Sequence, residues 1–344
     1  MRRILKYLAV AAVLAVAGFW SWRELDREMD RPAAAAEPVR VQLLPGEPLR
    51  AILVHLQQQG ALRHARLVEW YLRTHGQRPR VQAGTYEVAP HSSARAVLEQ
   101  FVAGRVVLEQ LTVVEGWNFA QLRHALDAHP ALLHALRGLP DQQLMRALGH
   151  DGQSAEGQFF PDTYRFAAGT SDRKILELAY DRMQLELEQS WNARAPQLPL
   201  SNSAQALILA SIVEKETGRE DERAKVAAVF VNRLHQGMRL QSDPTVIYGL
   251  GARYDGDIHT RDLETDTPYN TYTRAGLPPT PIALPGAASL QATLHPADID
   301  ALYFVATGDG DGTHQFSATL AQHDVAVRAY LHKLGVTSSR PPAP

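Results

Sequence analysis

The 344-residue sequence contains no cysteine. This absence excludes disulfides, zinc–thiolate sites and cysteine nucleophiles, and it leaves no thiol from which to infer a redox compartment. The sequence also lacks HExxH, GxSxG and GxxxxGK(S/T) motifs, so metalloprotease, α/β-hydrolase and phosphate-loop chemistry have no starting point. Positive charge is dispersed and the formal net charge is −2, which argues against nucleic acid as a partner.

One long apolar run is present, from Ile4 to Trp22, and it is just long enough to span a bilayer. Arginine and lysine residues precede it, and aromatic residues that suit the membrane interface close it. We therefore predict a cytoplasmic tip and transmembrane anchor over residues 1–22, with the bulk of the chain outside the cytoplasm. The alternative is a removable signal peptide cleaved after Ala15–Val16–Ala17. Both interpretations export the chain.

The hydrophobic content of 45% predicts two or three ordinary domains after the anchor. An alanine- and proline-rich stretch within residues 23–38 indicates a linker. Residues 39–104 follow in the order strand, helix, helix, strand, helix, and the pattern resembles a LysM-like glycan-binding module, with a generic α+β spacer as the alternative. We expect an intermediate region over 105–200, a catalytic domain over 201–336 and a flexible tail over 337–344.

The segment Ile212 to Arg219, reading IVEKETGR, places a carboxylate at the end of an apolar helix predicted over Ala204 to Thr217. Helical spacing directs Glu214 and Glu216 roughly 160° apart, so only one of them can face a given cleft. A carboxyl group held against apolar surface becomes a proton donor near neutral pH, which is glycosidase-type chemistry. The alternative is that these charges form only the solvated end of a core helix.

Downstream loops are dense in groups that suit sugar hydroxyls and ring faces. The alternative is a proline-stiffened structural loop. Asp243 is also a possible second carboxylate for a hydrolase, which would need to lie about 5–10 Å from Glu214. The candidate substrate-binding residues are Gln241, Asp243, Thr245, Tyr248, Asn270 and Tyr272.

No cofactor is expected, and no metal site is assigned. The glycine–aspartate segment at 308–313 resembles a calcium loop but lacks its terminal glutamate, so a hairpin turn between two strands is the better interpretation.

Several strings together resemble the YceG-like family of endolytic murein transglycosylases over essentially the whole chain. They are ASIVEKET at 210–217, RLQSDPTVIYG at 239–249, YNTY at 269–272, GLPP at 276–279 and LYFVA at 302–306. The likeness implies an α+β fold with an amino-terminal transmembrane helix, a LysM-like module and a larger catalytic domain whose buried helix carries the catalytic glutamate, which falls on Glu214.

The resemblance further implies a single-pass enzyme of the cell inner membrane that cuts nascent peptidoglycan strands and leaves 1,6-anhydro-muramic acid ends, terminating strand elongation. A single glutamate would serve as acid and then as base, and peptidoglycan synthase complexes are possible partners. Two alternatives remain open: a peptidoglycan-binding membrane scaffold without catalysis, and a two-carboxylate muramidase.

Overall fold

The computed structural model describes residues 2–44 and 46–335, and within its first helix it leaves the side chains of residues 2–6, 8–11 and 17 undescribed. The fold is a mixed α+β arrangement of many helices and small two-stranded sheets, as predicted. The chain divides into two compact units. Unit 1 contains Met1–Gln110 and Arg165–Thr170, and unit 2 contains Leu111–Tyr164 and Ser171–Pro344. The predicted tail at 337–344 lies outside the described residues.

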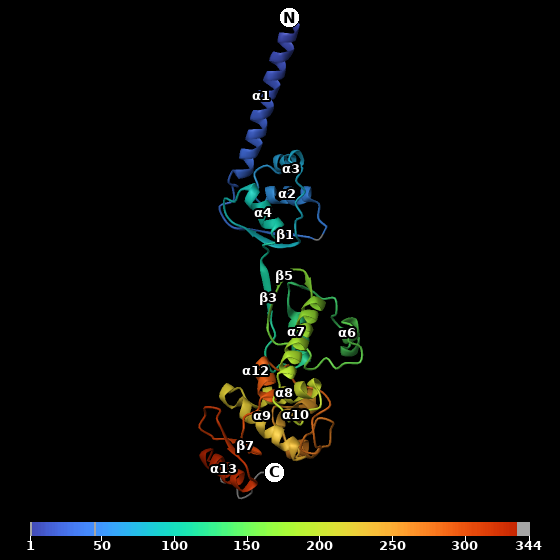
Figure 1. Cartoon of the computed structure of the whole chain (residues 1–344), viewed down its shortest axis with the longest axis vertical. Coiled ribbons are helices and arrows are strands. Elements are labelled where there is room, and N and C mark those ends of the chain that lie inside the picture. The colour runs from blue at the N-terminus through green and yellow to red at the C-terminus, as the bar shows by residue number, and fades with distance from the viewer. Residues whose placement is uncertain (1, 45, 336–344) are drawn as a thin grey trace. The chain divides into compact units, whose positions relative to one another are not determined.

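Unit 1 contains the predicted strand–helix–helix–strand order (Figure 1). Its two strands pair antiparallel in a register that sets Val39 opposite Val88 and Leu43 opposite Gly84. The likeness to LysM modules stays a prediction. The elements are α1 (Arg2–Asp30), β1 (Val39–Leu43), α2 (Leu49–Gln58), α3 (Ala65–Thr74), β2 (Gly84–Val88) and α4 (Ala94–Val102).

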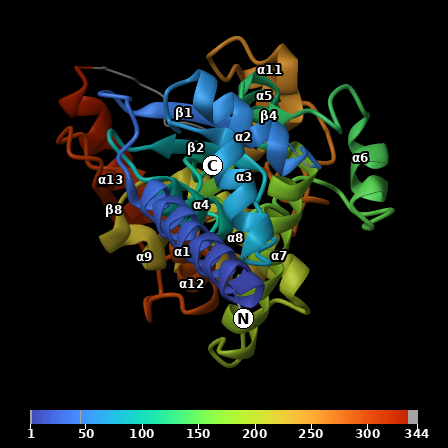
Figure 2. The same cartoon turned by 90° about the horizontal axis from the view of Figure 1, so that it is seen from above.

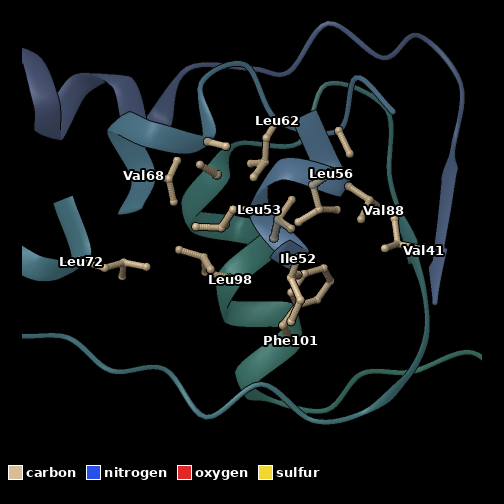
Figure 3. Packing of buried hydrophobic residues seen from close by; sticks show 14 of the residues in the cluster. Val41, Ile52, Leu53, Leu56, Leu62, Val68, Leu72, Val88, Leu98 and Phe101 are labelled. Atoms are coloured by element: carbon tan, nitrogen blue, oxygen red, sulfur yellow. The ribbon is translucent and has the colours of Figure 1, made fainter. Parts of the chain in front are cut away.

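The core of unit 1 is a single apolar cluster drawn from all of these elements (Figure 3). Leu56 and Phe101 are fully buried in it. Phe101 packs against Tyr86 with ring centroids 4.5 Å apart, and the hydroxyl of Tyr86 donates to the carbonyl of Gln82 at 2.8 Å. The aromatic pair therefore joins α4 to β2 without leaving a buried hydroxyl unsatisfied.

The carboxyl-terminal part of α1 packs against α3 and α4 (Figure 2). Leu25 and Met29 enter the core, and Arg95 of α4 forms ion pairs with Asp26 and Asp30 at 3.1 and 2.7 Å. The segment after it, predicted to be a linker, is also held: Ala33 N donates to the Ser92 carbonyl at 3.0 Å. This segment therefore packs as part of unit 1.

The amino-terminal part of α1 exposes large apolar side chains, including Leu14, Phe19 and Trp20. Among the side chains that are described, no helix combines the length and hydropathy needed to cross a membrane. Part of the predicted anchor, Ile4 to Trp22, lies outside those described side chains.

The core of unit 2 is centred on the apolar helix α8, which contacts α7, α9, α10 and α12 (Figure 1). The short strand pairs are β3 with β5, β4 with β6, and β7 with β8, and the boundaries between the units fall next to or within β3, β5 and β6. The remaining elements are β3 (Leu108–Thr112), α5 (Phe119–Ala128), β4 (Leu132–Leu133), α6 (Asp141–Ala147), β5 (Thr163–Ala167), β6 (Thr170–Ser171), α7 (Asp172–Asn192), α8 (Ser203–Glu216), α9 (Glu220–His235), α10 (Asp243–Leu250), η1 (Gly251–Arg253), α11 (Thr260–Glu264), α12 (Ala287–Leu294), β7 (Tyr303–Ala306), β8 (His314–Ser317) and α13 (Leu320–Lys333).

We expect Phe101→Ala to lower the free energy of unfolding of unit 1 by about 3–5 kcal/mol, because the substitution removes a fully buried ring and leaves a cavity. Urea denaturation of the full chain followed by circular dichroism measures this. Val102→Ala is the matched control, since Val102 on the same helix is 46% exposed. Equal losses in the two variants would contradict the packing described.

Candidate active site

Helix α8 begins at Ser203, where Asn202 caps its amino end by accepting a hydrogen bond from Gln205 N at 3.0 Å. Most of its apolar side chains, including Leu209 and Ile212, are fully buried, which confirms the predicted core helix. The helix ends where Thr217 turns extended, with φ −145° and ψ 132°. A buried helix of this kind holds its last side chains in fixed positions.

Glu214 lies in the last turn of α8 and is partly exposed. Its Oε2 accepts a hydrogen bond from the backbone N–H of Gly286 at 3.0 Å. Gly286 is the amino-terminal cap of α12, so the carboxylate faces the positive end of that helix. This arrangement fixes the orientation of the Glu214 carboxylate.

Glu115 is the second carboxylate of this region and was not identified from the sequence. It follows β3, and partial desolvation, followed by the charge of Glu214, raises its pKa. Arg223 opposes this increase. Only 8% of the Arg223 surface is exposed, and its Nε has no hydrogen-bond partner among the described residues. Glu214 therefore has a carboxylate neighbour, and that neighbour is Glu115.

Gly286 separates the two carboxylates and leaves no space for a side chain. A Cβ placed on Gly286 would lie 1.8 Å from Oε1 of Glu115 and 2.4 Å from its carboxyl carbon. A second glycine, Gly116, adopts φ +75°, and a Cβ there would lie 3.8 Å from Cγ of Glu214. Gly286 therefore lets the start of α12 lie against Glu115, whereas Gly116 has room for a Cβ and instead supplies a positive φ.

Glu216 faces a different segment from Glu214, as the helical spacing predicts. Its Oε1 accepts from the Ser242 hydroxyl at 2.5 Å, which connects α8 to the start of α10. Burial raises the pKa of Glu216 to about 7; Asp243 adds to the increase, whereas the Ser242 hydrogen bond and Arg233 oppose it. Glu216 therefore holds the segment that begins α10 against α8.

Glu156 is the fourth acid of this region, and only 6% of it is exposed. Its Oε1 accepts from Phe119 N at 3.0 Å, and its Oε2 accepts from the Tyr248 hydroxyl at 3.0 Å. Burial raises the pKa of Glu156 to about 7, against the opposing effect of these hydrogen bonds. The side chain therefore joins the amino end of α5 to α10.

A cavity of about 1290 Å³ lies among these segments of unit 2. Gly116 and Lys215, which adjoin Glu214, line the cavity. Glu156 from the loop at 151–156 and Tyr248 from α10 also line it. Glu214 itself is not part of the wall. The cavity therefore opens beside the catalytic candidate.

Two of the six predicted substrate-binding residues, Thr245 and Asn270, are almost fully buried and use their polar atoms internally. Thr245 Oγ1 donates to the Ser242 carbonyl at 2.7 Å, and the Asn270 amide donates to three carbonyls, the shortest at 2.8 Å from Thr265. These hydrogen bonds give Thr245 and Asn270 a positioning role for the loops around the site.

The other four predicted residues divide between two places. Tyr248 lines the cavity. Gln241, at φ +52°, accepts from Arg233 at 2.9 Å, and Asp243 accepts from the Tyr272 hydroxyl at 2.5 Å. Asp243 thus hydrogen-bonds to Tyr272, and its charge raises the pKa of Glu216. The charge of Glu214 instead raises the pKa of Glu115. Among the side chains that the structure describes, no group of three or more His, Asp or Glu is placed to hold a metal ion.

The raised pKa of Glu156 makes folding pH-dependent. A carboxyl whose pKa is higher in the folded state binds more protons in that state. Its contribution to the free energy of unfolding is therefore complete below its ordinary pKa of 4.5 and is lost as the pH rises to about 7. We expect the free energy of unfolding to fall across that window by up to about 1.4 kcal/mol per pH unit from this group. Denaturation of Glu156→Gln at several pH values should show a shallower slope.

Glu188→Gln serves as the matched control, because Glu188 is exposed on α7 and should keep the wild-type slope. Identical slopes for wild type and Glu156→Gln would rule out this role for Glu156.

Known proteins with similar sequences agree with the resemblance stated above. The chain is 28% identical over 310 residues to the endolytic murein transglycosylase of Bacillus subtilis, with 85% of each chain covered. It is 25% identical over 339 residues to the endolytic murein transglycosylase of Streptococcus pneumoniae, covering 88% of this chain and 60% of that protein.

A solved structure of a YceG-like protein from Listeria monocytogenes is also similar, with 27% identity and a TM-score of 0.54. The similarity covers 85% of this chain and 99% of that one. The model of the YceG-like family matches residues 41–329, a range that extends through parts of both units and includes Glu115, Glu156, Glu214 and Glu216. This chain is a member of the YceG-like family.

Proposed function

We propose that this protein is an endolytic peptidoglycan lytic transglycosylase with Glu214 as its catalytic acid and base. Its relatives in Bacillus subtilis and Streptococcus pneumoniae are enzymes of that name. The substrate is the β-1,4 bond between N-acetylmuramic acid and N-acetylglucosamine in new glycan strands, and cleavage ends strand elongation.

The observation that carries this proposal is the placement of Glu214. It combines a rigid position at the end of a buried helix, partial exposure, and a backbone donor at 3.0 Å on one oxygen. The Gly286 N–H occupies Oε2, which leaves Oε1 for the substrate. General acid–base catalysis requires a carboxyl held in this way, within hydrogen-bond reach of the leaving oxygen.

In the proposed mechanism the protonated Glu214 carboxyl first donates its proton to the glycosidic oxygen, and the C1–O bond breaks. The resulting anion is stabilised by the Gly286 N–H and the amino end of α12. It then accepts the proton of the muramyl C6 hydroxyl as that oxygen forms a bond to C1. One carboxyl is regenerated, and no water enters the product.

A second candidate, a two-carboxylate muramidase, is favoured by one observation: the presence of Glu115 beside Gly286 and Glu214. In hydrolysis Glu115 would activate water or act as nucleophile. We favour the one-carboxylate mechanism because the similar proteins of Bacillus subtilis and Streptococcus pneumoniae are named transglycosylases.

We further propose that α1 attaches the enzyme to the inner membrane, with both units in the periplasm. The exposed apolar side chains of α1, such as Val13, Leu14 and Phe19, support this proposal, because a contiguous apolar surface of this kind marks an interaction site. Unit 1 would bind glycan as a LysM-like module. Attachment beside growing strands makes peptidoglycan synthase complexes the expected partners.

We expect Glu214→Gln to lower the rate of glycan cleavage by about 10²–10⁴-fold, because glutamine can neither donate nor accept the required proton. Mass spectrometry of glycan strands after incubation with the purified full chain measures the products. Anhydro ends, lighter than hydrolytic ends by one water molecule, should appear with wild type and disappear with the variant.

Glu188→Gln should keep full activity, and Glu216→Gln tests the other glutamate of the helix. Retained activity in Glu214→Gln together with loss in Glu216→Gln would reassign the acid to Glu216. Water-added products would favour the hydrolase that uses Glu115, and intact strands with wild type would favour a non-catalytic scaffold.

For the membrane attachment, we expect the full chain expressed in a bacterium to sediment with membranes and to be released by detergent but not by high salt. Replacing Val13 and Leu14 by lysine should shift it to the soluble fraction, because each lysine costs about 2.5–3.5 kcal/mol at the centre of a membrane helix. Amino-terminal sequencing separates the alternatives, since a chain that begins after Ala17 would show a cleaved signal peptide.

A further inference from the structure

The cavity of about 1290 Å³ beside Glu214 has no role in the mechanism described above. It exceeds the roughly 300–1,000 Å³ of ordinary small-molecule sites, so it can accept a substantial part of a polymeric substrate. Its wall includes the turn after β3, the start of α5, α6, the loop at 151–156, Lys215 of α8 and part of α10, all within unit 2. The question is which part of the substrate it receives.

The position of the cavity relative to Glu214 indicates a branch of the substrate. Two residues that adjoin Glu214, Gly116 and Lys215, form one end of the wall, and Glu214 itself lies outside it. A group in the cavity is therefore next to the reacting bond but does not contain it. In peptidoglycan, the muramyl ring that undergoes cleavage carries a lactyl ether at C3 with a short peptide attached. That peptide leaves the glycan next to the reacting centre.

The charges on the wall indicate what the branch carries. Arg146 forms an ion pair with Asp151 at 3.2 Å, and Asp141 forms one with Arg123 at 2.7 Å, so these charges already have partners. Lys215 is different: its ammonium group contacts only the Gly116 carbonyl, at 3.3 Å, and it has no carboxylate partner among the described residues. An unpaired ammonium group on a cavity wall suits a carboxylate ligand.

Helix α8 places the Lys215 ammonium group next to Glu214, where it can bind a ligand. Lys215 follows Glu214 directly in the sequence, and its side chain is exposed. Its stem reaches back over Gly116, and a Cβ on Gly116 would lie 3.8 Å from Cδ of Lys215. A substrate carboxylate bound to the Lys215 ammonium group would therefore hold the substrate beside the proposed catalytic acid, Glu214.

We propose that this cavity binds the peptide attached to the muramic acid at the cleavage site, and that Lys215 binds a carboxylate of that peptide. This inference rests on the proposed transglycosylase function and names the part of the substrate that its site selects. Lys215 is a specificity-determining residue in this view, and strands that carry peptides are preferred over strands from which an amidase has removed them.

The test compares two substrates with the full-length enzyme: glycan strands with their peptides and the same strands after amidase treatment. We expect wild type to show a kcat/KM about tenfold higher for the peptide-bearing strands, the value of one charge-assisted hydrogen bond. Lys215→Gln should lower this ratio to near one. Lys174→Gln, at an exposed lysine of α7 paired with Glu177, should keep the wild-type ratio.

A second variant tests the cavity itself. Ala120 is exposed on the cavity wall, and Ala120→Trp should fill part of the space and lower the ratio without changing any charge. A wild-type ratio near one, or unchanged ratios in both variants, would overturn the proposal. Equal losses on both substrates would show that the cavity holds glycan. Absence of anhydro ends from both substrates would instead contradict the proposed function itself.

Discussion

The hydrogen bond from Gly286 N–H to Glu214 is the contact on which the rest of the site depends. It joins the last turn of α8 to the amino-terminal cap of α12, so two helix ends meet at one carboxylate. Neither end can shift freely, since α8 and α12 pack against each other in the core of unit 2. Through this bond the apolar core of unit 2 determines where the Glu214 carboxylate lies.

The acids around this contact differ in their surroundings and therefore in what they can do. Glu156 and Glu216 are desolvated and hold loops through hydroxyl or backbone donors, and each has a pKa of about 7. Glu115 lies close to Glu214, whose charge contributes to raising the pKa of Glu115. Protonation of the structural acids changes in the same pH range in which a glycosidase acid works. A pH profile of activity therefore reports on loop position as well as on catalysis.

The sequence was sufficient where local pattern determines structure. The apolar run before Glu214 predicted a buried helix, and alternation with turn residues predicted the strands of unit 1 and the carboxyl-terminal hairpin. It was also sufficient for the family, because several long strings occur in one order. These features depend on neighbours in the chain, which a sequence displays directly.

The sequence was insufficient where contacts join distant segments. Helix α12 was missed because it is eight residues long and follows a proline-rich stretch, and without it neither the Gly286 donor nor the crowding of Glu115 could be foreseen. Glu156 was overlooked as an acid because its partner Tyr248 lies 92 residues away. Thr245 and Asn270 have the residue types of a sugar site, and only burial reveals that they hold loops.

Helix α1 has a mechanical consequence. It runs for 29 residues without interruption, roughly 43 Å at 1.5 Å per residue, and its last turns are held to unit 1 by Arg95 and by the apolar core. A flexible linker would let unit 1 move through a volume around its attachment point. A stiff rod that continues into the body of unit 1 instead fixes its height above the attachment point. With the proposed membrane attachment, unit 1 would scan glycan in a thin layer at constant distance from the bilayer, and its search would proceed by lateral diffusion.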